Sequence, residues 1–157
     1  MRKQKGFSLI ELLIVVAIIL IIAAIAIPNL LRSRIAANEA SAVGSMRSIN
    51  TAQVTYASSY PDIGFAATLS VLGPTSGSTA VSSTNAGLVD NVLGCGTPPC
   101  NKSGYKFSVS GTTSAYISGG DPITVGQTGQ RYFYSDGSGV IRFNQTGAAG
   151  SGDSPLQ

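Results

Sequence analysis

The chain of 157 residues contains no histidine and only two cysteines, Cys95 and Cys100. Without histidine, neither a Ser-His nor a Cys-His catalytic arrangement can be built. Two thiols alone also cannot complete the four-ligand shell of a structural zinc site. The phosphate-binding motif GxxxxGK[ST] is missing as well. The sequence therefore predicts no enzyme, no catalytic residues, no cofactor and no metal site.

Charged side chains are scarce, at 11% of the residues, against about a quarter in a typical soluble domain. The net charge of +3 comes from the first residues, where Arg2, Lys3 and Lys5 cluster. A nucleic-acid site needs basic side chains gathered on one face of the folded body, so we predict no such site. A basic stretch before an apolar run instead orients that run with its basic end in the cytoplasm.

Residues 7–27 form a nearly unbroken apolar run. As a helix, this run would be about 30 Å long, which matches the hydrocarbon core of a membrane. The remaining chain is too small to bury a segment that is apolar on every side, so we expect it to span the membrane. The alternatives are a plain single-span anchor and a secretory signal peptide cut near Ala26. The helical pattern continues beyond Ala26, which counts against the signal peptide.

After Pro28 the sequence becomes amphipathic, and residues 28–60 predict a continuation of the same helix. One face carries apolar side chains spaced by three, four or seven residues: Leu31, Ile35, Ala42, Met46, Ile49, Tyr56 and Tyr60. Polar side chains, among them Glu39 and Asn50, fall largely on the other faces. Because proline lacks an N–H and its ring crowds the preceding turn, we expect Pro28 to bend or loosen the helix.

The rest of the chain predicts a small head that ends in a sheet. Residues 61–103, rich in Gly, Ser, Thr and Pro, predict an irregular connection in which 88–93 could form a short helix. In residues 104–145, apolar and polar residues alternate, which predicts an antiparallel sheet of three to four strands. Asp136-Gly137 is a strong hairpin signal within it and is preferred to a calcium loop. The tail, 146–157, is expected to be flexible. The predicted fold class is α+β, a long N-terminal helix packed on a small antiparallel sheet.

The cysteine pair has two readings that depend on the compartment. If the body is exported, Cys95 and Cys100 can form a disulfide. The enclosed loop is short, so the chain-entropy estimate of its stabilisation is modest, about 2 kcal/mol. Two free thiols remain the alternative if the body stays in the cytoplasm.

Glu11 is the unusual residue of the apolar run. A carboxylate inside a spanning helix costs several kcal/mol unless it is paired, and such residues are functional by default. Its own helix offers no cation at a suitable position. A free α-amine at Phe7 would be a suitable partner if the chain were cut after Gly6 and the amine belonged to a neighbouring copy.

The segment KGFSLIELLIVVAIILIIAAIAIPN, from Lys5 to Asn29, resembles the N-terminus of type IV prepilins and of the pseudopilins of type II secretion. The closing segment RYFYSDGSGVIRF resembles the same superfamily less specifically. The resemblance implies that a prepilin peptidase cuts between Gly6 and Phe7 and methylates the new amine of Phe7. It also implies that Glu11 guides subunit docking through that amine, and that the helix loosens near Pro28 in the filament.

The resemblance implies the following organisation: a leader (1–6), a transmembrane and polymerisation half of the helix (7–27), an amphipathic half (28–60), a connection (61–103), a sheet (104–145) and a tail (146–157). The expected function is that of a structural subunit of a type IV pilus that serves adhesion, twitching motility or DNA uptake. The expected partners are copies of the chain, the prepilin peptidase, an inner-membrane assembly platform with its ATPase, and membrane lipid.

The implied location is the bacterial inner membrane for the precursor, with the leader in the cytoplasm and the head in the periplasm. The mature subunit would lie in an extracellular or periplasmic filament. The alternative is the major pseudopilin of a type II secretion system. A disulfide favours a pilin, because pilin heads often carry one. Cys95 and Cys100 would nevertheless close a loop before the sheet, where pilins usually pin the C-terminal region, and this keeps the alternative open.

Overall fold

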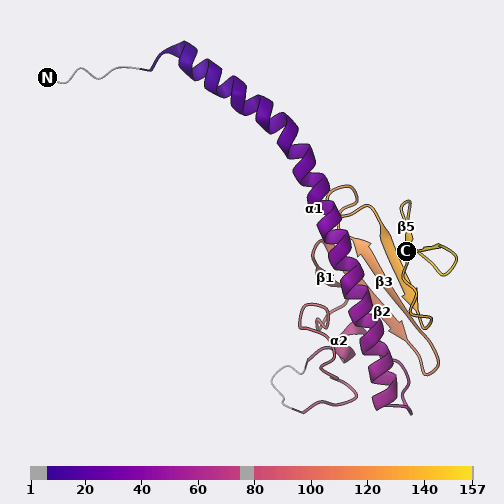
Figure 1. Ribbon diagram of the computed structural model, residues 1–157. Helices are drawn as coiled ribbons and strands as arrows, with labels where there is room; N and C mark the ends of the chain where they lie inside the picture. The colour runs from indigo at the N-terminus through magenta and orange to yellow at the C-terminus, as the bar shows by residue number, and fades with distance from the viewer. Residues whose placement is uncertain (1–6, 75–79, 157) are drawn as a thin grey trace. The chain divides into compact units, whose positions relative to one another are not determined.

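The computed structural model describes residues 7–74 and 80–156 (Figure 1). The elements of this part are, in chain order, α1 (Leu9–Ser59), α2 (Leu69–Leu72), β1 (Cys100–Lys102), β2 (Tyr105–Gly111), β3 (Tyr116–Pro122), β4 (Tyr132–Asp136), β5 (Arg142–Asn144) and β6 (Ser154–Pro155). The chain divides into two compact units, Met1–Arg34 and Ile35–Gln157. The predicted α+β class is confirmed.

The first unit contains the apolar part of α1. Its large apolar side chains are all exposed, from 46% for Val16 to 80% for Phe7. By length and composition, α1 is a helix that could cross a membrane. Pro28 lies inside the helix and cannot donate to the carbonyl of Ala24, four residues earlier. Loosening of the helix at this position stays a prediction.

The second unit packs the C-terminal half of α1 against one face of the sheet (Figure 1). Met46 and Ile49 of the helix and Phe107 and Phe133 of the strands are at most 1% exposed in one apolar cluster. The predicted helix face is therefore confirmed within this unit, where its buried members are Ala42, Met46, Ile49 and Tyr56. Leu31 belongs to the first unit and is 48% exposed.

The sheet is antiparallel, with its strands in the order β1-β2-β3-β4-β5-β6. The alternating segments within residues 104–145 form β2 to β5. The predicted hairpin joins β4 to β5, where the Gly139 N–H donates to the Asp136 carbonyl over 2.9 Å. The predicted count of three to four strands is too low, because the described residues form six. The two extra strands lie at the edges, and two or three residues are too few to show a period.

These edge strands also move the boundaries of the sheet beyond residues 104–145. At one end, β1 takes its three residues from the connection, 61–103. At the other, β6 lies in the predicted tail, 146–157, where the Leu156 N–H donates to the Ile141 carbonyl over 2.8 Å. The short helix expected at 88–93 is wrong. The segment is a turn in which one oxygen of Asp90 accepts the N–H groups of Val92 and Leu93.

Glu39 and Asn50 were expected on the outer faces of the helix, but both are buried. Glu39 accepts the backbone N–H groups of Gln130 and Arg131 and the Nε of Arg131, the last over 2.7 Å. Asn50 donates to Ser135 over 2.8 Å. Their partners lie at the start of β4 and within it, so helix periodicity alone could not reveal these contacts. Both residues fasten α1 to the sheet.

Candidate functional site

The start of α1 has a defined polar geometry. The helix begins at Leu9, and the backbone N–H of Ser8 donates to Oε2 of Glu11 over 2.9 Å. The Leu12 N–H donates to the Ser8 carbonyl over 3.2 Å. A glutamate at the third helical position that reaches back to the residue before the helix is one half of a capping box. Glu11 therefore stabilises the start of its own helix.

This interaction is visible in the sequence as Ser8-Leu9-Ile10-Glu11, the capping-box spacing, although Glu11 was interpreted only through a partner from another chain. The hydrogen bond occupies one carboxylate oxygen, Oε2. Among the described residues, no hydrogen bond is made by Oε1. Its negative charge also lies in the first turn of the helix, where the helix dipole favours it. The carboxylate can thus cap the helix and still accept a second donor.

The predicted site residues are distributed over both units. Phe7 and Glu11 lie together at the exposed start of α1, whereas Gly6 lies outside the described residues. Pro28 is in the same helix, about 25 Å further along its axis from Glu11. Cys95 and Cys100 belong to the second unit. Phe7 and Glu11 thus belong to the first unit, and the disulfide belongs to the second.

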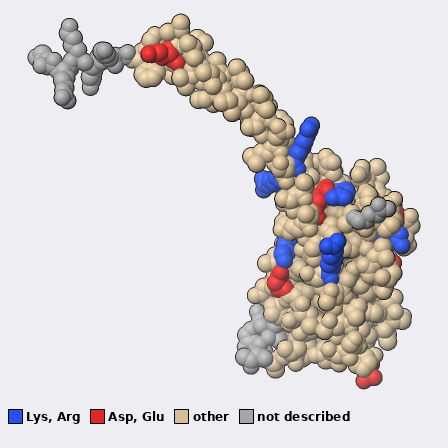
Figure 2. Space-filling model, viewed as in Figure 1, with Lys and Arg blue, Asp and Glu red and all other residues tan. Residues whose placement is uncertain are grey.

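The apolar surface beyond Glu11 is continuous. No charged residue occurs between Glu11 and Arg32, and the space-filling view shows the uncharged stretch (Figure 2). On one side of it, a shallow groove is lined by Leu9, Leu12, Leu13, Val16, Ala17 and Leu20. Exposed apolar surface of this extent marks contact with a membrane or with other protein. Small residues such as Ala17 and Ala24 permit helices to approach closely.

The disulfide is present as expected, and it joins Cys95 to Cys100 with an S–S distance of 2.02 Å. Cys100 is the first residue of β1 and is 1% exposed. The bond therefore ties the end of the connection to the edge of the sheet. Within the described residues, no group of three or more His, Cys, Asp or Glu side chains could hold a metal ion.

The turn after β4 is held by hydrogen bonds to Asp136. Oδ1 of Asp136 accepts the backbone N–H of Ser138 over 2.9 Å and its hydroxyl over 2.6 Å. These hydrogen bonds hold the pKa of Asp136 below its ordinary value. One carboxylate oxygen is thus already used inside the turn, in agreement with the hairpin interpretation.

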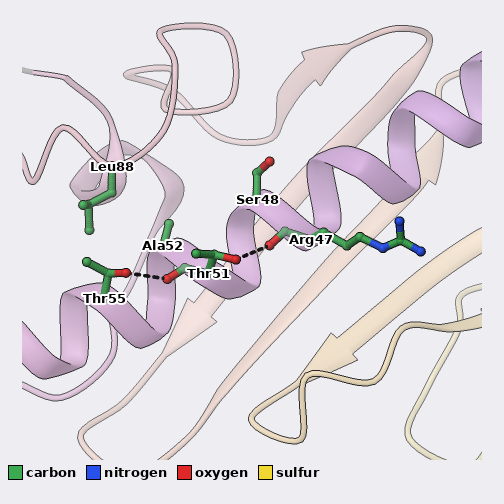
Figure 3. Close-up of a pocket in the computed structure, with 6 residues that line it drawn as sticks. All are labelled: Arg47, Ser48, Thr51, Ala52, Thr55 and Leu88. Atoms are coloured by element: carbon green, nitrogen blue, oxygen red, sulfur yellow. Dashed lines mark hydrogen bonds between the residues drawn. The ribbon is translucent and has the colours of Figure 1, made fainter.

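A hollow beside α1 in the second unit also lacks the groups of a catalytic site (Figure 3). It is lined by Arg47, Ser48, Thr51, Ala52, Thr55 and Leu88. Its hydroxyls donate to carbonyls one turn earlier in the helix, Thr55 to Thr51 over 2.9 Å and Thr51 to Arg47 over 3.0 Å. Their protons are therefore committed to the helix backbone, and none of the six lining residues is a base that could activate a nucleophile.

Comparison with known proteins places the similarity at the N-terminus. The family described as the prokaryotic N-terminal methylation motif matches residues 1–27. The type IV wide pilus major component PilA4 of Thermus thermophilus is 67% identical over 39 residues, which cover 25% of this chain and 30% of the relative. The type IV major pilin protein PilA of Myxococcus xanthus is 44% identical over 54 residues, 34% of this chain and 24% of the relative.

These alignments span less than a third of either relative's length. No solved structure matches the chain. For the N-terminal segment, the comparisons confirm the resemblance to type IV pilins.

Proposed function

We propose that this chain is the major structural subunit of a type IV pilus, made as a membrane-inserted precursor and polymerised through α1. The observation that carries the proposal is the composition of the N-terminal helix. Ser8 and Glu11 at the start of the helix are followed by an exposed apolar surface without a charge, in a chain whose residues 1–27 match the N-terminal methylation motif.

The first step of the proposed mechanism is processing. A prepilin peptidase cuts between Gly6 and Phe7 and methylates the amine of Phe7. The cut removes the basic residues of the leader and creates a cation beside the start of α1. Glu11 of one subunit then pairs with the Phe7 amine of another, through the carboxylate oxygen that the Ser8 N–H leaves unoccupied.

The second step is the transfer of α1 from lipid to protein. Lipid tails are as apolar as leucine, so exchange of lipid for neighbouring helices need not expose the apolar surface to water. Pro28 is the position where the helix loosens during this transfer. An inner-membrane assembly platform and its ATPase supply the work of extraction. The precursor stays in the bacterial inner membrane with its leader in the cytoplasm and its head in the periplasm.

Two measurements test the function. Intact-mass analysis of the native protein is expected to give a chain that starts at Phe7 and carries one added methyl group. Electron microscopy of sheared material is expected to show filaments that contain this chain and that disappear when its gene is deleted. The variant Gly6→Val should keep the precursor mass and form no filaments. A mature N-terminus near Ile27 would instead identify a secretory signal and contradict the proposal.

A further inference from the structure

A second surface of the head has the properties of a binding site. In β2 and β4, Phe107 and Phe133 point into the core beside α1, so the alternate residues Ser108 and Tyr134 point to the opposite face of the sheet. On this outer face lies a hollow of about 300 Å³. Its lining includes Ser108, Ile117, Asp121, Tyr134, Ala148 and Ala149.

The floor of the hollow is Gly119 in the central strand β3. Its register partners are Ser108 on β2 and Tyr134 on β4, so the missing side chain leaves a gap between a hydroxyl and an aromatic ring. A Cβ atom at this position would meet only the Ser108 Oγ, at 3.2 Å. The space above Gly119 is therefore empty because the residue is glycine, and a larger side chain could fill it without a clash against the backbone.

Asp121 joins this hollow to a second one of about 390 Å³, which is also lined by Ser108, Lys106, Pro98 and Pro99. Asp121 lies two residues beyond Gly119 on the same face and opposite Lys106. Among the described residues, its carboxylate accepts no hydrogen bond. Burial raises the pKa of Asp121, and the charge of Lys106 opposes that rise. A partly buried carboxylate with unused acceptor positions thus lies where two hollows meet.

The chemistry of the groove excludes several classes of ligand. The strands β2, β3 and β4 are paired with one another, so their backbone groups cannot receive an added peptide strand. One carboxylate is too few for a calcium or magnesium site. Lys106 lies opposite Asp121 and offsets its charge, so the groove has no net charge that would select a strongly anionic or a strongly cationic ligand. The groups that line the two hollows are hydroxyls, one carboxylate, one ammonium and an aromatic ring, which suit a ligand rich in hydroxyl groups.

We propose that the outer face of β2, β3 and β4 binds a neutral oligosaccharide, with one sugar ring above Gly119 against Tyr134 and the next ring toward Pro98 and Pro99. Asp121 accepts hydrogen bonds from sugar hydroxyls at the junction. Each hollow has the volume of a small ligand site, about 300 Å³ or more. The binding site is additional to filament assembly and does not depend on it.

The test uses the full chain in a detergent without a sugar headgroup. Maltotriose, chitotriose and lactose serve as soluble probes in saturation-transfer NMR, beside a glycan microarray. We expect binding of at least one neutral oligosaccharide, and a loss of about tenfold or more in affinity for Gly119→Val and for Asp121→Asn. Gly137→Val is the matched control, because a Cβ at Gly137 would have nothing within 4 Å. It should bind as the unchanged chain does.

Each other outcome overturns the proposal. Absence of signal from every soluble probe and every array member shows that the groove binds no saccharide, whereas filament formation would still support the pilus function. Equal binding by Gly119→Val and the unchanged chain places the sugar elsewhere. If Gly119→Val binds no less sugar but blocks filament formation, the groove is a contact between copies of the chain. Retention of the disulfide and of the thermal unfolding midpoint establishes that each variant is folded.

Discussion

Glu11 has one role that the structure shows and one that is proposed, and substitutions of this residue can separate the two. It caps its own helix through the Ser8 N–H over 2.9 Å, and it is proposed to pair with an amine of another subunit. A neutral amide oxygen can still accept the capping hydrogen bond, because the capping box accepts Gln in place of Glu. Pairing with an amine, in contrast, depends on the charge. Substitution by glutamine therefore preserves one role and weakens the other.

We predict that Glu11→Ala leaves the protein in the membrane, because loss of a charge makes the span more apolar. Filament assembly should fail or fall sharply, since loss of one member of a buried charge pair costs about 3 to 5 kcal/mol. Glu11→Gln should be milder but still defective, and Glu11→Asp should retain partial function. The measurement is a count of sheared filaments beside a blot of the membrane fraction. Normal filaments from Glu11→Ala would show that the charge has no part in docking.

Glu39 provides a second prediction at the residue scale. Its carboxylate accepts three hydrogen bonds and faces Arg131, whose guanidinium lies 5.6 Å from the ring centre of Phe133 and 5.5 Å from that of Phe143. Glu39→Ala should lower the free energy of unfolding by about 3 kcal/mol, because two backbone N–H groups and a cation lose their partner together. Denaturant unfolding of the head, followed by circular dichroism, measures the change.

The matched control is Lys102→Ala. It breaks the ion pair of Lys102 with Asp90, whose side chain is 50% exposed. Exposed pairs contribute about 1 kcal/mol or less, so this variant should change stability far less than Glu39→Ala does. Equal effects of the two variants would contradict the anchoring role of Glu39.

The contrast between Glu11 and Glu39 shows what the sequence can reveal about single residues. Glu11 is conspicuous because it interrupts an apolar run, and its capping partner is only three positions away in the chain. Glu39 looks like an ordinary polar residue on the outside of a helix. Its partners, Gln130 and Arg131, are more than ninety positions away, and only the folded sheet brings them to it. Long-range polar contacts of this kind leave no local pattern.

At the scale of elements, predictability follows length. The helix and the strands β2, β3 and β4 were predicted because each repeats its apolar spacing, whereas β5, with three residues, was indicated by the hairpin signal at Asp136-Gly137 before it. The helix α2 has four residues, β1 three and β6 two, so none repeats a pattern. Gln53 gives another example, because its buried amide donates to the Ala66 carbonyl and accepts the Ala66 N–H. The Gln53 side chain thus makes with the connection the pair of hydrogen bonds that a neighbouring strand would make. No periodicity in the sequence indicates these bonds.

The disulfide allows a prediction about the connection as an element. The bond closes a short loop at the edge strand β1, so replacement of Cys95 and Cys100 by alanine should lower the free energy of unfolding by about 2 kcal/mol. Thermal unfolding with and without reductant measures the effect. The unchanged chain in reductant should approach the double variant, whereas the variant itself should not respond. An unchanged stability of the double variant would contradict the prediction. Thiol alkylation without reductant checks that the native protein carries the bond.

At the scale of the whole molecule, the head has a predictable response to acid. The hydrogen bond from Lys102 lowers the pKa of Asp90, and those from Ser138 lower the pKa of Asp136, each from an ordinary value of 3.8. Their contribution is therefore present above that value and is lost as the pH falls through the lower pKa of the folded state. Asp121 makes the opposite contribution to the pH dependence of stability, because its pKa is raised in the folded state.

We predict that the unfolding midpoint falls when the pH is lowered from 6 to about 3 and that Asp90→Asn makes this fall smaller. The side chain of Asp90 is 50% exposed, so the effect should be modest. Asp62→Asn is the control, because Asp62 is exposed and forms no ion pair among the described residues. Thermal melts across this pH range provide the measurement. An identical pH dependence for Asp90→Asn and the unchanged chain would contradict the assignment.

The two units of the chain differ in how they are stabilised. The first unit exposes its apolar side chains and has no buried residue among those described. The second contains the entire apolar cluster, from Ala42 on α1 to Ile141 before β5. The anchor at Glu39 and the disulfide also lie within the second unit. The stability of the head should therefore not depend on the exposed apolar part of the helix.

We predict that a chain that starts at Ile35 folds on its own, remains soluble and forms no filaments. It retains every buried contact of the head and loses only the exposed apolar surface, which would otherwise require lipid or other helices. Size-exclusion chromatography should show a monomer, and denaturant unfolding should give the same midpoint as the head of the full chain in detergent. The same shortened chain with Glu39→Ala should unfold at lower denaturant, because the anchor still operates without the first unit. An aggregated or unfolded product would show that the first part of α1 stabilises the head. In that case the proposed transfer of α1 from lipid to filament would also alter the stability of the head.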